Sequence, residues 1–226
     1  DWNYGTDFGN SDNRYPYGSD EYNWVYDNLG AGRGMSGGAL PADSPEYPAL
    51  EAEANIPVIT SEGKSNVKIA GVKSKNKLVR YTIPETLLRA DENFLALMVE
   101  AEKYIGYPYV YGGSKPSTGF DCSGFVCWVF RQSGVYDTGR LGAKGLYSLC
   151  TDVSRDEARP GDLVFFTKTM GADVKGITHV GIYVGNDMML HAGDPVGFAD
   201  LQSDKWAKKI YAFGRLPVQQ GAQANE

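Results

Sequence analysis

The chain has 226 residues, of which 42% are hydrophobic and 22% are charged, and its formal net charge is −6. This composition is typical of a folded globular protein of one or two domains and excludes a fibre or a disordered chain. The acidic total argues against a nucleic-acid binder, and no stretch approaches the roughly 18 apolar residues of a membrane span. Because the chain begins with Asp1, we interpret it as a trimmed or processed piece from which a signal or anchor could have been removed.

Positive charge is concentrated in residues 64–80. This stretch carries six basic residues and no acidic one: Lys64, Lys68, Lys73, Lys75, Lys77 and Arg80. Three runs here have the β-branched content of short strands, namely 56–60, 66–72 and 77–83, although Pro57 favours an edge or a loop for the first. We interpret residues 55–87 as a basic connector of short strands. A solvated strand pair is the favoured explanation of its charge, and contact with an anionic polymer is the alternative.

Helical spacing follows this connector. Apolar residues recur at intervals of three and four: Phe94, Leu97, Met98, Ala101 and Ile105. Asp91 is a good N-cap residue, and Gly106 supplies a stop. After a loop rich in Gly and Pro, a second helix is predicted from about Cys122 to Gln132, and it is buried because its apolar residues lie nearly all round.

After residue 160 the hydrophobic period changes to two. Four strands are predicted, separated by Gly, Asn and Asp turns: 162–167, 179–185, 188–192 and 209–216. Helices followed by a meander of strands indicate an α+β fold.

The cysteines and histidines limit the chemistry that this chain can support. Three cysteines are too few for a disulfide framework, their number is odd, and no Cys-x-x-Cys pair occurs. The two histidines, His179 and His191, are twelve residues apart with no adjacent ligand cluster, so we expect no metal and no cofactor. What remains is a set of free thiols, one of which is a candidate nucleophile.

Cys122 has the most reactive setting of the three thiols. It stands between a glycine-rich loop and the start of the second predicted helix, in the segment 112–125 (GGSKPSTGFDCSGF). Free backbone N–H groups and the positive end of a helix dipole favour a thiolate there, and the same N–H groups could stabilise an oxyanion. The alternative is that Cys122 is a small buried hydrophobic residue. Cys127, in mid-helix, and Cys150 are better interpreted as packing residues.

His179 and His191 lie on two predicted strands that a turn at Gly185-Asn186-Asp187 joins into a hairpin. For their side chains to share one face, paired residue numbers must sum to an even value, as with 181 opposite 191. A three-residue loop gives that register, whereas a two-residue turn gives it only with a bulge. A nucleophile, a base and a group that orients the base form a catalytic set, which Cys122, His179 and His191 supply.

Five motifs, taken in chain order, resemble a known family. They are YPYVYGG (107–113), FDCSGFV (120–126), RPGDLVFF (159–166), HVGIYVG (179–185) and MLHAG (189–193). They are similar to those of the NlpC-type cell-wall endopeptidases, which are papain-like cysteine peptidases that act on bacterial peptidoglycan. The resemblance covers about residues 88–217 and implies a papain-like α+β fold, in which helices, one starting at the nucleophile, pack on a mainly antiparallel sheet.

The resemblance also implies a role for individual residues. Cys122 matches the nucleophile, His179 the base and His191 the polar group that orients the base. Tyr109 matches a tyrosine whose hydroxyl lies near the thiol and helps at the oxyanion. Two further residues, Asp121 and Ser123, match those that flank the nucleophile, and the former is typical of substrate amine recognition.

The function implied is hydrolysis of peptidoglycan stem peptides, at the bond between the γ-carboxyl of D-glutamate and the following diamino acid, through a thioester intermediate. Alternatives are a papain-like amidase or acyltransferase on cell-wall peptides, or an inactive wall-binding module. The expected location is extracellular or in the cell wall, with peptidoglycan as the partner and no nucleic acid. More loosely, residues 138–147 and 211–216 resemble wall hydrolases carried by conjugative elements of Gram-positive bacteria.

Residues 1–54 match no module of that family. They combine ten acidic residues and a linker composition over 30–38 with six tyrosines and two tryptophans. Because a solvated linker has little use for so many large rings, we expect this segment to pack on the outer surface of the catalytic domain. Occupation of the substrate groove is the alternative. Residues 218–226 are predicted to be a flexible tail.

Overall fold

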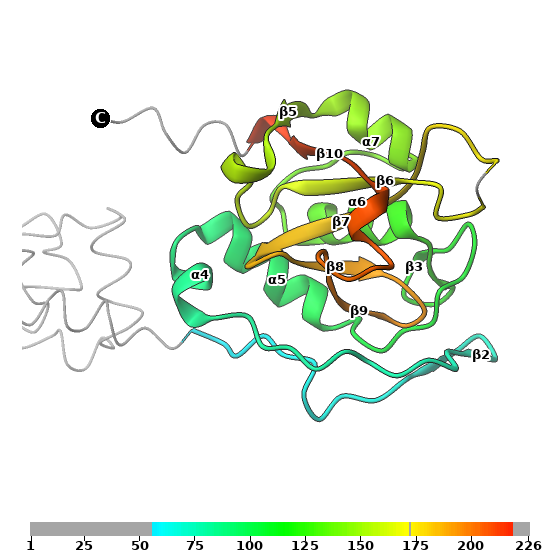
Figure 1. Ribbon diagram of the computed structural model, residues 1–226. Coiled ribbons are helices and arrows are strands. Elements are labelled where there is room, and N and C mark those ends of the chain that lie inside the picture. Colours follow the sequence, from blue (N-terminus) through cyan, green and yellow to red (C-terminus); the bar gives the residue numbers. More distant parts are fainter. Residues whose placement is uncertain (1–55, 172, 219–226) are drawn as a thin grey trace, which may run out of the picture. The chain divides into compact units, whose positions relative to one another are not determined.

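The computed structural model describes residues 56–171 and 173–218, so the predictions for residues 1–54 and for most of the tail lie outside the described residues. The described part is α+β, as predicted (Figure 1). Its helices are α4 (Glu85–Arg89), α5 (Glu92–Glu102), α6 (Cys122–Gln132) and α7 (Ala143–Leu149). Its strands are β1 (Lys68–Ile69), β2 (Val72–Lys73), β3 (Ser114–Lys115), β4 (Gly119–Phe120), β5 (Thr151–Val153), β6 (Leu163–Thr167), β7 (Ile177–Gly185), β8 (Met188–Ala192), β9 (Val196–Asp200) and β10 (Ile210–Arg215).

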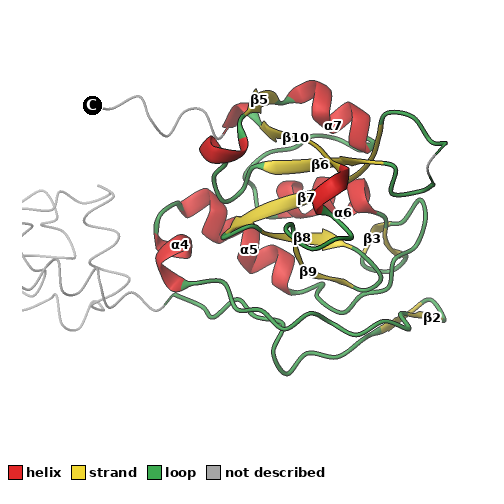
Figure 2. Ribbon diagram, viewed as in Figure 1, coloured by secondary structure: helices red, strands yellow, loops and turns green. Residues whose placement is uncertain are grey.

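Six of these strands form the central antiparallel sheet, in the order β5-β10-β6-β7-β8-β9. Helices α5 and α6 lie together on one face of this sheet (Figure 2). The main hydrophobic core fills that interface and includes Phe94, Phe125 and Ile182. A second cluster, built around Phe166 and Trp206, covers the opposite face. The sheet is therefore apolar on both sides, and polar side chains on it stand out.

The two long helices form where the sequence places them. Asp91 caps α5, because its Oδ1 accepts a hydrogen bond from the backbone N–H of Phe94 at 2.8 Å. Helix α5 ends at Glu102, three residues before the predicted last apolar position, and Tyr104 and Ile105 enter the core from the following turn. Helix α6 has the predicted bounds and is buried on nearly all sides.

The β7–β8 hairpin has the second of the two turn arrangements that the sequence allowed, a two-residue turn with a bulge. Asn186 and Asp187 form a two-residue turn with positive φ values of 52° and 55°. Ile182 pairs with Leu190, but beyond Tyr183 the register shifts so that Gly185 pairs with Met188, which marks a bulge. The bulge restores an even sum of residue numbers along the rest of the hairpin. His179 and His191 consequently share one face of the sheet.

Other predicted strands are wrong or incomplete. Within residues 56–60 and 77–83 the only ladder contact is an isolated bridge between Thr60 and Thr82. The run 66–72 does not form one strand, because the chain turns back at Ala70-Gly71 and makes the short hairpin of β1 and β2. Six of the helices and strands were not predicted, namely α4, α7, β3, β4, β5 and β9, and each has at most seven residues.

The described part of the basic connector is fixed to the catalytic domain. The side-chain amide of Asn76 donates to the carbonyl of Asp194 at 2.9 Å, just beyond β8. The Val67 N–H donates to the Gly106 carbonyl at 2.9 Å, and Lys64 forms an ion pair with Glu102 at 3.1 Å. The connector runs along one edge of the domain, on the side of β9, in cyan and teal in Figure 1. Among the described residues, no helix is both long and apolar enough to cross a membrane.

Candidate active site

The start of helix α6 places Cys122 against the sheet. Asp121 is the N-cap residue, and its Oδ1 accepts a hydrogen bond from the N–H of Gly124 at 2.6 Å. Gly124 allows this close packing, because a Cβ there would lie 2.1 Å from the carbonyl oxygen of Gly113. The Cys122 side chain is buried and faces three backbone amides, its own and those of Ser123 and Val180. The amide of Val180 belongs to β7 and directly follows His179.

The two histidines are in direct contact. Nε2 of His179 lies 2.8 Å from Nδ1 of His191. If Nε2 of His179 carries the proton and donates it to His191, then Nδ1 of His179 is left to accept a proton from a thiol. The ring of Trp206 stacks on His179 with centroids 5.2 Å apart and meets His191 edge-on at 5.0 Å. Trp206 therefore fixes the orientation of both imidazoles.

The thiol and the base are close but not hydrogen-bonded. Within the described residues, Sγ of Cys122 makes no hydrogen bond with a ring nitrogen of His179, although the amide that follows His179 faces the sulfur. In free enzymes such catalytic contacts are often long and shorten only when substrate binds. The arrangement brings Cys122 to the strand that carries His179 and joins His179 to His191.

Burial keeps both reactive groups neutral. Burial, together with the negative charge of Asp121, raises the pKa of the Cys122 thiol to about 11. The three backbone amides lower this pKa but only in part offset the increase. Burial, followed by the positive charge of Lys205, lowers the pKa of His179 to about 3, and burial holds the pKa of His191 well below its usual value. The expectation of a resting thiolate is thus wrong, because desolvation outweighs the helix N-terminus. The site holds a thiol beside a neutral imidazole.

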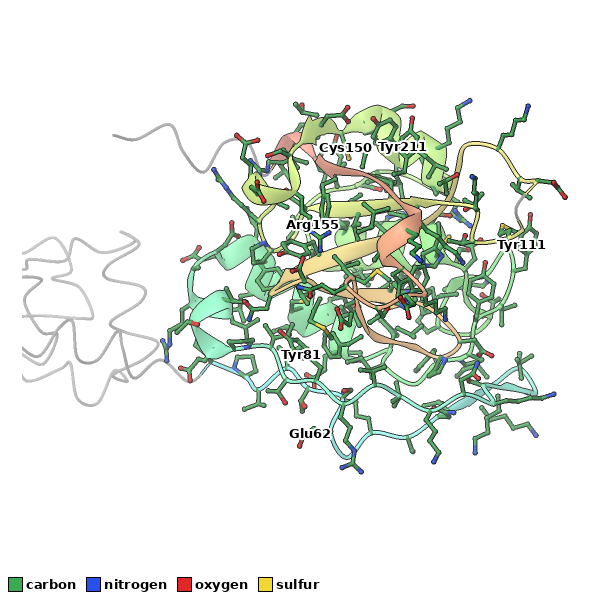
Figure 3. The ribbon with its side chains drawn as sticks, viewed as in Figure 1. Glu62, Tyr81, Tyr111, Cys150, Arg155 and Tyr211 are labelled. Atoms are coloured by element: carbon green, nitrogen blue, oxygen red, sulfur yellow. The ribbon has the colours of Figure 1, made fainter. Side chains whose placement is uncertain are left out.

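Tyr109 lies near the thiol, as the sequence suggested. Burial raises the pKa of its phenol to about 12, and the charge of Cys122 is the next contribution. The phenol therefore keeps its proton at neutral pH and can donate a hydrogen bond. Tyr109, His179 and His191 all line one pocket of about 290 Å³, and so does Tyr111, which is exposed and is labelled in Figure 3. This pocket gives access to the histidine pair.

Asp121 and Ser123 are occupied by contacts within the protein. The Oδ2 of Asp121 accepts from Nη2 of Arg140 at 2.7 Å, and the Ser123 hydroxyl donates to Oδ1 of Asp121 at 3.1 Å. Nη1 of Arg140 donates in turn to the Ser123 hydroxyl at 3.0 Å. These bonds stabilise the start of α6. A role of either residue toward a substrate amine stays a prediction.

Cys127 and Cys150 contact backbone carbonyls elsewhere in the domain. Sγ of Cys127 lies 3.6 Å from the carbonyl of Leu141, and Sγ of Cys150 lies 3.3 Å from that of Leu146. All three cysteines are free. Among residues 56–171 and 173–218, no group of three or more His, Cys, Asp or Glu side chains is placed to hold a metal ion.

The sequence pattern of the NlpC/P60 family matches residues 106–215, from the turn before Tyr109 to the last strand of the sheet. This range contains every residue of the site described above. Residues 106–215 form a domain of the NlpC/P60 family. The narrower resemblance to hydrolases of conjugative elements stays a prediction.

Several relatives of known name share this NlpC/P60 region. The chain is 46% identical over 121 residues to the bifunctional muramidase/DL-endopeptidase CwlT of Bacillus subtilis (strain 168), a match covering 53% of this chain and 36% of the relative. It is 41% identical over 120 residues to the gamma-DL-glutamyl hydrolase of the same strain, covering 52% and 28% respectively. The chain thus spans about a third of these relatives or less.

A solved structure from the NLP/P60 family also matches. It is a protein similar to a lipoprotein from Staphylococcus aureus subsp. aureus Mu50, with 41% sequence identity and a TM-score of 0.52. The match covers 56% of this chain and 42% of that one. It agrees with the α+β fold of a helix layer on a mainly antiparallel sheet.

Four residues that complete the NlpC/P60 site were not predicted from the sequence. Trp206 and Lys205 lie in an irregular loop after β9, where no periodicity marks them. Arg140 lies in a loop. Only the need of the buried Asp121 carboxylate for a positively charged partner could have suggested its role. Gly181, within the HVGIYVG motif, sits opposite His191, and a Cβ there would lie 3.1 Å from the Cβ of His191. A side chain at position 181 would displace that histidine.

Proposed function

We propose that this chain is a cysteine endopeptidase that hydrolyses the peptide part of bacterial peptidoglycan. The observation that carries the proposal is the hydrogen bond between His179 on β7 and His191 on β8, next to the Val180 amide of β7 that faces the Cys122 thiol. Named relatives of the shared region include a DL-endopeptidase and a gamma-DL-glutamyl hydrolase. For this chain we infer cleavage between the γ-carboxyl of D-glutamate and the next diamino acid.

The first half of the reaction forms a thioester. As Sγ of Cys122 attacks the scissile carbonyl carbon, its proton moves to Nδ1 of His179, whose Nε2–H stays bonded to His191. The carbonyl oxygen becomes an oxyanion, for which the amides of Cys122 and Ser123 and the phenol of Tyr109 are the available donors. When the tetrahedral intermediate collapses, the C–N bond breaks and the leaving amine takes the proton from His179.

The second half regenerates the enzyme. Water gives a proton to Nδ1 of His179 and adds to the thioester carbonyl, and the same donors stabilise the second oxyanion. The C–S bond then breaks, the proton returns from His179 to the sulfur, and the product leaves with a new γ-carboxylate. Each turnover therefore consumes one water and releases one amine and one acid.

Peptidoglycan as partner and a location outside the cell or in its wall follow from this proposal. Two other functions use the same residues differently. A papain-like amidase or acyltransferase would form the same thioester on another amide or pass it to an amine. An inactive wall-binding module would not need the thiol.

Digestion of a defined muropeptide separates these functions. The full chain is incubated with a purified monomeric muropeptide, and the products are identified by mass spectrometry. The proposal expects a fragment ending in D-glutamate and a second fragment with a new amine on the diamino acid. Cleavage at another amide, or transfer without hydrolysis, would favour the amidase or acyltransferase, and intact substrate would favour the inactive module.

A further inference from the structure

The basic connector shares a continuous surface with the active site. The pocket of about 290 Å³ that Tyr109, His179 and His191 line is the catalytic pocket. It adjoins a second hollow of about 420 Å³, and His191, Lys205 and Trp206 line both. The second hollow in turn shares Lys77 and Leu78 with a third one of about 450 Å³. Three adjacent hollows thus lead from the catalytic histidines to the connector.

The third hollow is strongly basic. It is lined by Lys64, Lys73, Lys77 and Arg80, and no acidic residue lines it. Lys64 is neutralised by Glu102, but within the part of the chain that the structure describes Lys73, Lys77 and Arg80 form no ion pair. Three uncompensated cations around one concave surface repel one another, and an anion placed there would relieve this repulsion.

The backbone of the connector enforces this gathering of charge. The β1–β2 hairpin places Lys68 directly opposite Lys73, and such like-charged pairs are destabilising. The side-chain amide of Asn66 donates to the carbonyls of Ser74 and Asn76, at 3.1 and 2.7 Å, and holds the hairpin closed. In Figure 3 many side chains of this edge end in nitrogen and point outward. A merely solvated strand pair has no need of such a fixed arrangement.

The charges of the second hollow, which lies between the other two, indicate what kind of molecule could occupy all three. It contains Asp194 and Asp200 as well as Lys77 and Lys205, so it is not a uniform anion site. A free anion would need only the third hollow, whereas the shared residues connect that hollow to the catalytic pocket. An extended molecule that occupies all three explains this continuity, provided that its acidic groups reach the connector.

We propose that Lys73, Lys77 and Arg80 bind carboxylates of the polymeric peptidoglycan beyond the stem peptide held in the catalytic pocket. This inference rests on the proposed function, because it takes peptidoglycan as the molecule in the groove. Neighbouring stem peptides carry free carboxylates, and the connector is their docking site. It adds affinity for the polymer and leaves the chemistry at Cys122 unchanged.

Binding to insoluble sacculi tests this proposal without any need for catalysis. Full-length Cys122→Ala protein is cosedimented with sacculi from which phosphodiester-linked polymers have been removed by acid. Adding Lys73→Gln, Lys77→Gln and Arg80→Gln should weaken binding roughly tenfold at low salt and reduce its salt dependence. The matched control carries Lys144→Gln, Lys175→Gln and Lys208→Gln, which remove the same charge from exposed positions outside the three hollows, and should bind within about twofold of the parent.

Each result decides between alternatives. Equal binding by the two triple variants would overturn the proposal, as would a defect that appears only on sacculi that retain phosphodiester polymers, because the ligand would then be a phosphate chain. Melting temperatures of both variants check that they fold. With Cys122 present, the connector variant should show a higher KM on polymeric peptidoglycan and an unchanged kcat/KM on a monomeric muropeptide. Failure of the wild type to cleave either substrate would refute the proposed function but leave the binding result standing.

Discussion

Cys122 and Cys150 are both largely buried thiols, and yet only one has the surroundings of a nucleophile. Burial raises the pKa of Cys122 to about 11 and that of Cys150 to about 12. Their neighbours differ. A carboxylate raises the pKa of each thiol further, Asp121 at Cys122 and Asp162 with Asp152 at Cys150, but only Cys122 also faces backbone amides, three of them, which lower it. Cys150 lies well away from Tyr111, which lines the same pocket as the two histidines (Figure 3).

This difference shows that a low resting pKa is not what distinguishes the candidate nucleophile. At Cys122 the surroundings can accept a proton and hold a developing negative charge, since a neutral imidazole and several donors converge there. The chain has only two histidines, and both lie at this site. At Cys150 the nearby groups are negative and would oppose any anion. Reactivity is built from the groups that stabilise the transition state rather than from a preformed thiolate.

The largest expected effect is the loss of activity when Cys122, but not Cys150, is substituted. Cys122→Ala should lower kcat/KM on a muropeptide by at least about a thousandfold, because the thioester can no longer form. Cys150→Ser and Cys127→Ser should leave the chemistry intact. Product formation followed by mass spectrometry measures all three variants. Full activity of Cys122→Ala would assign the nucleophile elsewhere.

The phenols beside the two cysteines give a matched pair. Tyr109→Phe should lower kcat roughly a hundredfold, since removal of one oxyanion donor has an effect of about that size. Tyr147, near Cys150, donates to Asp152 at 3.0 Å instead, and Tyr147→Phe should leave kcat within about twofold. Steady-state kinetics on one muropeptide compares them. Similar kcat values for both variants would remove Tyr109 from the mechanism.

The imidazole pair should respond to chemistry rather than to size alone. His191→Asn can still offer an acceptor to the Nε2–H of His179, whereas His191→Ala cannot, so we expect Asn to retain roughly tenfold more activity than Ala. His179→Ala should be nearly inactive in the same assay. Equal losses for the two substitutions at 191 would mean that His191 does more than orient the base.

The smallest expected effect concerns the thiols themselves. Burial raises the pKa of both thiols, but three backbone amides act against this increase at Cys122, whereas carboxylates add to it at Cys150. Cys122 should therefore react faster with iodoacetamide, although it is the less exposed of the two. Both rates should keep rising with pH through 9. Peptide mapping of partly alkylated protein measures them. Faster alkylation of Cys150 would contradict the assignment of Cys122 as the nucleophile. An alkylation rate of Cys122 that stops rising near neutral pH would show that its thiol is already ionised there.

The parts of the fold governed by local rules could be predicted from the sequence. The N-cap at Asp91, the bounds of α6 and the long strands follow from capping residues and hydrophobic period. The hairpin register also followed, because only an even sum brings both histidines to one face. Short elements such as β9 (VGFAD) carry too few residues for a period to show, and they form because neighbouring strands pair with them.

The sequence predicted that Cys122, His179 and His191 would come together, but it predicted neither the side chains that surround them nor the electrostatics of the site. The helix N-terminus at Cys122 argued for a thiolate, but the desolvation that overrides it depends on how closely α6, β7 and Trp206 pack. The partners of Asp121 come from Arg140, nineteen residues further along the chain, and no sequence spacing indicates that contact. Burial and contacts between residues distant in the sequence decide which groups are protonated, and local sequence patterns do not reveal them.

Partition of the acyl intermediate tests the central claim most directly. The wild type is allowed to cleave a defined muropeptide in the presence of increasing hydroxylamine, and the products are analysed by mass spectrometry. A thioester on Cys122 predicts that part of the acyl product appears as the hydroxamate of the D-glutamate γ-carboxyl, in a share that grows with hydroxylamine, and that Cys122→Ala forms none. Cleavage that yields only the free acid at every hydroxylamine concentration would contradict the thioester route.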